Sequence, residues 1–378
     1  MKKILVAGVS ALLSTHSFAA DAPTGPLAFP PIGNTLKANP KPLAVDAGPV
    51  GNIHVSGVLS GLGYTQSNPT ATDDTSRLDI SNAQLFLQKN SGLLQFYVQA
   101  GGYSIPALGT SYIEADDTTD DFYGVVPVAY VTLAPTDYFS LSVGKLPTLI
   151  GGEYTYTFQN ANIQRGLLWN QENAVNRGIQ ANFTADKLAV SVSLNDGFYS
   201  EEYSWLTGLA TYTIDDNNTV AIAGGGNLGD DARATTNTPL LQNNSQIYNL
   251  IYTHKTGPWT VMPYLQYSSV DADASIGITD GAQTYGAALL ASYAVNDHVS
   301  IAARGEFIDS NGGANLLYGA DSSAWSFTVT PTYQKDAFFV RAEASYVGID
   351  DGVAGSQFGS SSNESAQGRL LIETGLVF

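Results

Sequence analysis

Six charged residues in the last quarter of the chain form three pairs of opposite sign: Arg304 with Glu306, Arg341 with Glu343, and Arg369 with Glu373. In an extended strand, residues two or four positions apart point to the same side, so the members of each pair share a face. Such side chains suit the wall of a water-filled channel, where they could create an electric field across the path of a solute. The alternative is a structural ladder, in which opposite charges on neighbouring strands stiffen the wall. The sequence leaves both interpretations open.

A second charged group, Glu153, Arg165 and Glu172, falls in residues 148–175, the longest segment without strand periodicity. Its length allows it to fold back into the interior of a wide barrel. There the three side chains would narrow the pore and impose a field of mixed charge. A surface lid that never enters the channel is the alternative. We therefore predict a pore constriction at these three residues.

The chain offers little for catalysis or for binding a metal or cofactor. It has no cysteine, which excludes disulfides, thiolate ligands and thiol nucleophiles. It has four histidines. His16 lies in the N-terminal segment, and His54, His254 and His298 fall at the ends of predicted strands, next to short turns that we expect on the periplasmic side. No histidine spacing is typical of a metal site. We expect no catalytic residue, no cofactor and no metal site.

Acidic residues dominate the charge of the chain. It has 34 Asp and Glu against 16 Lys and Arg, a net charge of −18 that repels nucleic acid. The predicted outer loops hold 22 of the acids, including the cluster Glu114, Asp116, Asp117, Asp120 and Asp121. An acidic mouth concentrates cations, which predicts a modest cation preference. The cluster could also bind Ca²⁺ or Mg²⁺ that bridges lipopolysaccharide phosphates, but no calcium-loop spacing is present and a solvated surface is the simpler interpretation.

The elements that position these charges are short strands with one apolar and one polar face. Residues 188–195 alternate strictly, and at the end of the chain Leu370 and Phe378 share one side while Arg369 and Glu373 lie on the other. A lipid bilayer offers no hydrogen-bond partners, so a sheet can cross it only when it closes and turns its apolar face outward. The terminal aromatic Phe378 is the expected assembly signal for the barrel-assembly machinery.

Short turns and long loops alternate strictly from residue 51 to the end of the chain. Seven turns and eight loops separate sixteen strands, and this asymmetry is typical of outer-membrane barrels. The predicted fold is all-β: a transmembrane antiparallel up-and-down β-barrel of about 16 strands, with 14–18 allowed. A barrel of this width encloses water rather than filling itself with side chains.

The N-terminal region precedes the predicted barrel and consists of two segments of different composition. Residues 1–20 combine Lys2 and Lys3, an apolar run and a small-residue cleavage site, which predicts a cleaved signal peptide. Residues 21–49 are rich in proline and are interpreted as an extended periplasmic leader that can enter the barrel mouth. The barrel domain then spans residues 50–378.

The centre of the chain resembles a known family. Residues 143–147 (Val-Gly-Lys-Leu-Pro), 151–153 (Gly-Gly-Glu), 176–179 (Asn-Arg-Gly-Ile) and 195–197 (Asn-Asp-Gly) resemble motifs of the OmpL-like β-barrel porins of Gram-negative bacteria. The resemblance covers the central third well and the rest as a generic barrel. It implies a pore for small solutes in the outer membrane.

The expected function is passive diffusion of ions and small hydrophilic solutes through an outer-membrane porin. A substrate-specific channel and a structural or surface-interaction barrel without transport are the alternatives. The expected partners are outer-membrane lipid, lipopolysaccharide, the assembly machinery and small solutes, with a homo-oligomer as a further option.

Overall fold

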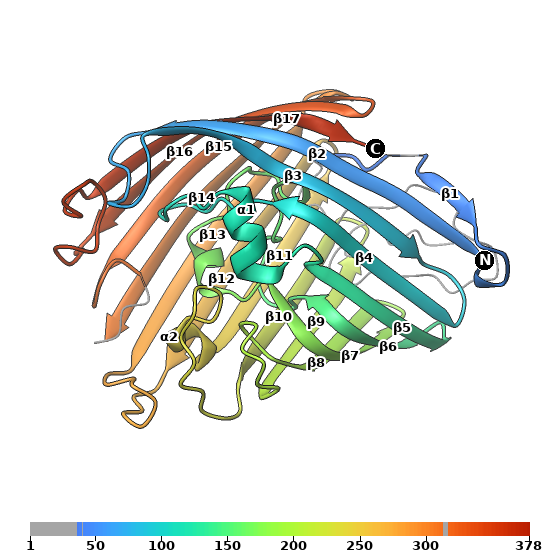
Figure 1. Ribbon diagram of the computed structural model, residues 1–378, viewed down its shortest axis with the longest axis horizontal. Coiled ribbons are helices and arrows are strands. Elements are labelled where there is room, and N and C mark those ends of the chain that lie inside the picture. Colours follow the sequence, from blue (N-terminus) through green and yellow to red (C-terminus); the bar gives the residue numbers. More distant parts are fainter. Residues whose placement is uncertain (1–35, 40, 313–316) are drawn as a thin grey trace.

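The computed structural model describes residues 36–39, 41–312 and 317–378. Sixteen antiparallel strands, β2 to β17, form a closed barrel (Figure 1). Each strand pairs with the next along the chain, and β17 pairs with β2 to close the sheet. The predicted fold class is confirmed, with the predicted number of strands. The predicted signal peptide lies outside the described residues.

The strand bounds are β1 (Leu43–Asp46), β2 (Asn52–Gln66), β3 (Ser76–Lys89), β4 (Leu94–Tyr103), β5 (Val128–Thr136), β6 (Phe139–Pro147), β7 (Val175–Ala185), β8 (Leu188–Asn195), β9 (Trp205–Asp215), β10 (Asn218–Asn227), β11 (Gln246–Thr256), β12 (Trp259–Val270), β13 (Ala282–Ala294), β14 (Val299–Gly312), β15 (Ser323–Lys335), β16 (Phe338–Asp350) and β17 (Ala366–Val377). Two short helices, α1 (Ala115–Thr118) and α2 (Leu240–Asn243), lie in the β4–β5 and β10–β11 loops. Among the described residues, no helix has the length and apolarity needed to cross a membrane.

The two faces of the sheet have opposite chemistry. On β17, Leu370 and Ile372 are each 59% exposed on the outside, whereas Arg369 and Glu373 are buried on the inside. Exposed and buried residues alternate through β12 to β16 as well, and the buried positions of β15 are mostly polar, whereas β12 and β13 also bury apolar residues such as Met262 and Leu290. Apolar side chains outward and polar side chains inward are the arrangement that a lipid bilayer requires of a barrel.

The C-terminal residue closes the seam of the barrel. The Phe378 N–H donates to the Gly57 carbonyl at 2.9 Å, and the Gly57 N–H donates to the Phe378 carbonyl at 2.7 Å. A Cβ atom at position 57 would lie 2.6 Å from the Phe378 ring, so only glycine leaves room for this aromatic side chain. The predicted assembly signal thus lies against β2.

Part of the N-terminal leader lies against the end of the barrel. Strand β1 pairs with residues 52–55 of β2, on the edge that β17 leaves free beyond Phe378 (Figure 1). Leu36 is buried in the same apolar cluster as Phe339 and Val377. The backbone of Lys37 exchanges two hydrogen bonds of 2.7 and 2.8 Å with the Gln334 side chain.

Candidate functional site

The segment between β6 and β7, residues 148–174, lies inside the barrel and is called the lumen loop here. None of its residues is exposed, and most are buried. Its polar groups contact inward-facing side chains of β11, β12 and β14 to β17. The sequence-predicted constriction residues Glu153, Arg165 and Glu172 are therefore all placed in the lumen.

Glu153 of the lumen loop forms one cluster with Arg304 and Glu306, the first of the three predicted charge pairs. The Arg304 Nη1 atom donates to Glu153 Oε1 at 2.5 Å, and Arg304 Nε lies 3.1 Å from Glu306 Oε2. The Gly166 N–H donates to Glu153 at 2.7 Å, and the Leu167 N–H donates to Glu306 at 3.1 Å. A Cβ atom at position 166 would lie 2.1 Å from Glu306, so glycine is required for the loop backbone to approach these carboxylates.

Arg341, Glu343 and Glu373, which belong to the second and third predicted charge pairs, also contact the lumen loop. Arg341 Nε donates to Glu373 at 3.0 Å on the neighbouring strand, and its Nη atoms donate to the carbonyl oxygens of Thr157 and Asn160 at 3.0 Å each. Glu343 accepts the Ile163 and Gln164 N–H groups. These charges combine a cross-strand ion pair with attachment of the loop to the wall.

Arg369 reaches the outer end of the lumen. Its Nη1 atom donates to Gln164 Oε1 at 2.7 Å, and its Nη2 atom lies 3.6 Å from Asp73 in the β2–β3 loop. Burial alone would raise the pKa of Asp73, but hydrogen bonds from Gln66, the Tyr112 N–H and Tyr64 lower it further than burial raises it. Arg369 therefore joins the lumen loop to an outer loop.

Arg165 and Glu172 are buried in different surroundings. Arg165 donates to the carbonyl oxygens of Thr155 and Ile163 within the loop itself. Burial lowers the pKa of its guanidinium to about 10, because the charged form loses hydration. Glu172 accepts hydrogen bonds from Tyr264 and Gln266 of β12, and burial raises the pKa of its carboxyl group.

Aromatic residues attach the lumen loop to the opposite wall, which the sequence reasoning missed. The Phe158 ring packs 5.4 Å from Phe86 of β3, and Tyr156 packs edge-on to Tyr103 of β4 at 5.2 Å. The available signal was the inward parity of Phe86 among polar neighbours. A buried aromatic side chain on an otherwise polar face implies a packing partner in the lumen.

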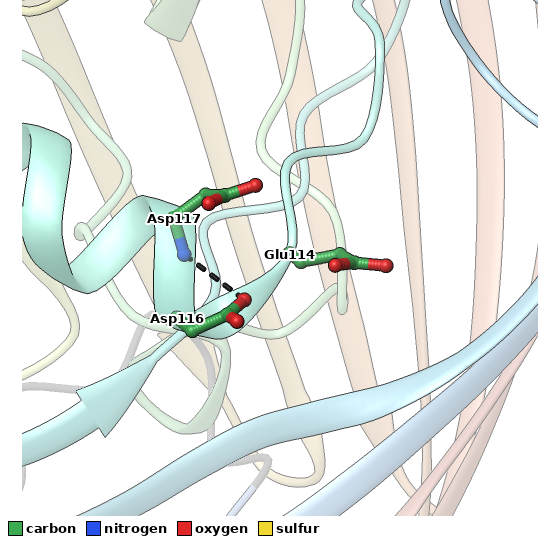
Figure 2. A group of neighbouring side chains, drawn as sticks. All are labelled: Glu114, Asp116 and Asp117. Carbon is green, nitrogen blue, oxygen red and sulfur yellow. Dashed lines mark hydrogen bonds between the residues drawn. The ribbon is translucent and has the colours of Figure 1, made fainter.

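The predicted acidic cluster is partly assembled at the outer rim. Glu114, Asp116 and Asp117 lie around the start of α1, with carboxylate oxygens within 4.8 Å of one another (Figure 2). Asp116 accepts the Asp117 N–H, and Arg77 forms an ion pair with Glu114. Because a guanidinium already neutralises part of this charge, the arrangement fits a solvated acidic surface.

The geometry defines a class: a β-barrel of the bacterial outer membrane with charged residues on its inner wall and an inserted loop. The chain belongs to the family described as "Putative beta-barrel porin-2, OmpL-like", whose model matches residues 52–378. A comparison with curated proteins finds no match.

Solved outer-membrane barrels share the fold. An anion-selective porin from Comamonas acidovorans has a TM-score of 0.61 and 12% identity, covering 86% of this chain and 99% of that one. Outer-membrane expressed OmpT of Vibrio cholerae has a TM-score of 0.60 and 14% identity, covering 89% and 100%. The channel DcaP of Acinetobacter baumannii has a TM-score of 0.59 and 10% identity, covering 86% and 97%. The chain is accordingly an outer-membrane porin-type barrel.

Proposed function

We propose that this barrel is a passive diffusion channel for ions and small hydrophilic solutes, narrowed by the lumen loop, rather than an enzyme. The observation that carries the proposal is the attachment of an inserted loop to inward-facing charges, led by the contact of Glu153 with Arg304. A loop fixed inside a wide barrel narrows the path through which water and solutes pass, and the side chains that line this path determine its shape.

Selectivity for cations is the finer part of the proposal. Among the residues that the structure describes, the buried charged groups of the lumen are five glutamates and four arginines: Glu153, Glu172, Glu306, Glu343 and Glu373, with Arg165, Arg304, Arg341 and Arg369. The outer loops add further acids at the mouth. An excess of negative charge along both regions favours cations. An anion-selective reversal potential in a salt gradient would contradict this part.

Thiol labelling tests the constriction, because the protein has no cysteine of its own. Asn170 is a partly exposed residue of the lumen loop, and Ser361 is an exposed residue of the β16–β17 loop. A bulky thiol reagent on an N170C variant should reduce single-channel conductance, whereas the same reagent on S361C should not. Equal conductance of labelled and unlabelled N170C would refute the proposal.

A homo-oligomer is the proposed assembly, on fold analogy alone. OmpT of Vibrio cholerae has a trimer form with a TM-score of 0.58 to this chain. Cross-linking in native outer membranes should give a ladder that ends at the oligomer.

A further inference from the structure

A groove lies on the outer surface of the barrel, at the end that carries the short turns. It is lined by residues 48–52, which lead into β2, by the β3–β4 turn and by the first residues of β4, and its volume is about 960 Å³. Leu94 and Val131 line it and are 58% and 54% exposed. Phe96, a further lining residue, lies opposite Val131 on the neighbouring strand. The groove is therefore continuous with the apolar outer face of the barrel.

Lys89 brings a positive charge to this groove. It follows Leu85 and Leu87 on the outward-facing row of β3, and those two leucines are 51% and 40% exposed. The Lys89 Nζ atom donates to the Leu94 carbonyl at 2.5 Å and to the Ser91 carbonyl. An ammonium group has three N–H donors, so one remains for a ligand. No described Asp or Glu lies within ion-pair distance of Lys89, and none of the lining residues of the groove is acidic.

Glycines in the two turns leave room for the lysine side chain. A Cβ atom at position 92 would lie 3.3 Å from Lys89 Nζ, and one at position 51 would lie 3.8 Å from Lys89 Cε. Gly92 and Gly51 both have positive φ, +79° and +89°, a conformation that favours glycine. The Lys89 side chain therefore lies beside both turns, the one that precedes β2 and the one between β3 and β4.

The same end of the barrel carries aromatic side chains on its outer surface. Tyr138 in the β5–β6 turn and Phe183 near the end of β7 are both exposed, and their rings pack edge-to-face with centroids 6.2 Å apart. Aromatic side chains of this kind are enriched where a barrel meets the headgroups of a bilayer. A lysine at such a strand end keeps its stem against apolar surface and its ammonium near the headgroups.

An amphiphile with a negatively charged head fits these features. The chain has a net charge of −18, so most of its surface repels an anionic headgroup, whereas a lysine without an acidic partner attracts one. A lysine near the membrane surface strengthens the binding of anionic lipid. The exposed apolar side chains beside it match an acyl chain, which a free phosphate ion does not offer.

We propose that the groove binds one anionic phospholipid, with the phosphate on Lys89 and an acyl chain against Leu94 and Val131. The lipid comes from the leaflet on the side of the short turns, because Lys89 lies at that end of its strand. The site lies outside the barrel, so the inference does not rest on ion conduction through the lumen. A phospholipid held by both its phosphate and an acyl chain should remain with the protein when other lipids exchange for detergent.

Native mass spectrometry of the purified protein in detergent tests the site, with dioleoyl phosphatidylglycerol as the probe. The wild type should bind one lipid tightly, and K89Q should bind it about fivefold more weakly, because one lysine near a membrane surface contributes about that factor. K89R should keep most of the wild-type affinity. K187Q is the matched control: Lys187 is an exposed lysine of the β7–β8 turn whose Nζ atom also donates to a backbone carbonyl, at 2.8 Å, and its loss should leave the affinity unchanged. Heat-modifiable migration verifies that each variant is folded.

Crystals grown with a phosphatidylglycerol that carries brominated acyl chains give the position, because bromine scatters anomalously. A bromine peak beside Leu94 and Val131 is expected, and it should be absent in K89E, whose carboxylate repels the phosphate. The inference would be overturned by wild-type affinity in K89Q, by an equal loss of affinity in K187Q, or by bromine peaks elsewhere on the barrel only. Inorganic phosphate that displaces the lipid as effectively as dihexanoyl phosphatidylglycerol would show an anion site without an acyl-chain contact, and would also overturn it.

Discussion

Replacing Arg304 with glutamine should release the lumen loop from the charged wall. The variant removes the only arginine in ion-pair contact with Glu153 and Glu306 among the described residues. Both carboxylates would then remain buried without an ion-pair partner. Breaking a buried ion pair by removing one partner typically costs about 3–5 kcal/mol, chiefly because the other charge stays buried.

That cost can be relieved by moving the loop rather than by unfolding the barrel. The strands keep their ladder hydrogen bonds, whereas Glu153 can regain hydration if the loop leaves the wall. We therefore expect R304Q to form a folded barrel with larger and noisier single-channel conductance than the wild type. The double variant R304Q/E153Q should be less perturbed than R304Q, since only Glu306 then lacks its partner.

The assay is planar-bilayer recording of purified protein, with heat-modifiable migration as the check on folding. R233Q is the matched control: its ion pair with Glu201 lies at the surface, where the carboxylate is exposed, and such pairs contribute little to stability. It should leave single-channel conductance unchanged. If R304Q gave wild-type conductance and wild-type thermal stability, the reasoning that this arginine holds the loop would be refuted.

Three further predictions concern the seam, the outer loop and the leader. G57A should destabilise the folded barrel by about 1–3 kcal/mol, because the added Cβ displaces the Phe378 ring. The temperature at which heat changes the gel migration of the barrel should fall, and a wild-type temperature would contradict the seam contact. G305A is the control, because its Cβ would meet no atom within 4 Å. The pKa of Asp73 is lowered in the folded protein, so its carboxylate stabilises the fold above the ordinary aspartate range, and this stabilisation is lost as the pH falls through the folded pKa. D73N should therefore be less stable than the wild type at neutral pH and equally stable in acid. D230N, at an exposed position, is the control, and a stability difference that does not depend on pH would argue against the hydrogen-bonded carboxylate. L36A should weaken the packing of the leader against the barrel by about 2–5 kcal/mol and speed tryptic cleavage after Lys37. L93A, at the exposed β3–β4 turn, is the control and should leave the cleavage rate unchanged. An unchanged cleavage rate in L36A would mean that Leu36 does not hold the leader.

The strands were predictable because their signal is local. Successive side chains of a strand point to opposite faces, and in Leu188–Asn195 the exposed apolar and buried polar residues alternate clearly enough to show both faces without the neighbouring strands. Short turns between strands then set the count. Strand β1 escaped prediction because four residues in a proline-rich segment carry too little periodicity, and only the free edge of β2 selects them.

The inward position of the candidate residues was predictable from the sequence, but their contacts were not. Inward parity identifies Arg304 and Arg341 as lumen residues, and loop length identifies the inserted segment. The partners depend on contacts between residues far apart in the chain, such as Glu153 with Arg304 and Asn160 with Arg341. Sequence parity says which side a residue faces, whereas the loop conformation decides what it meets there.

The central claim is that the lumen loop narrows a water-filled path through the barrel. Single-channel recording of a variant lacking residues 155–170, with folding verified by heat-modifiable migration, tests it most directly. The account predicts a conducting wild-type protein and a clear rise in conductance after the deletion. A folded deletion variant with unchanged conductance, or a folded wild-type barrel that carries no current, would contradict it.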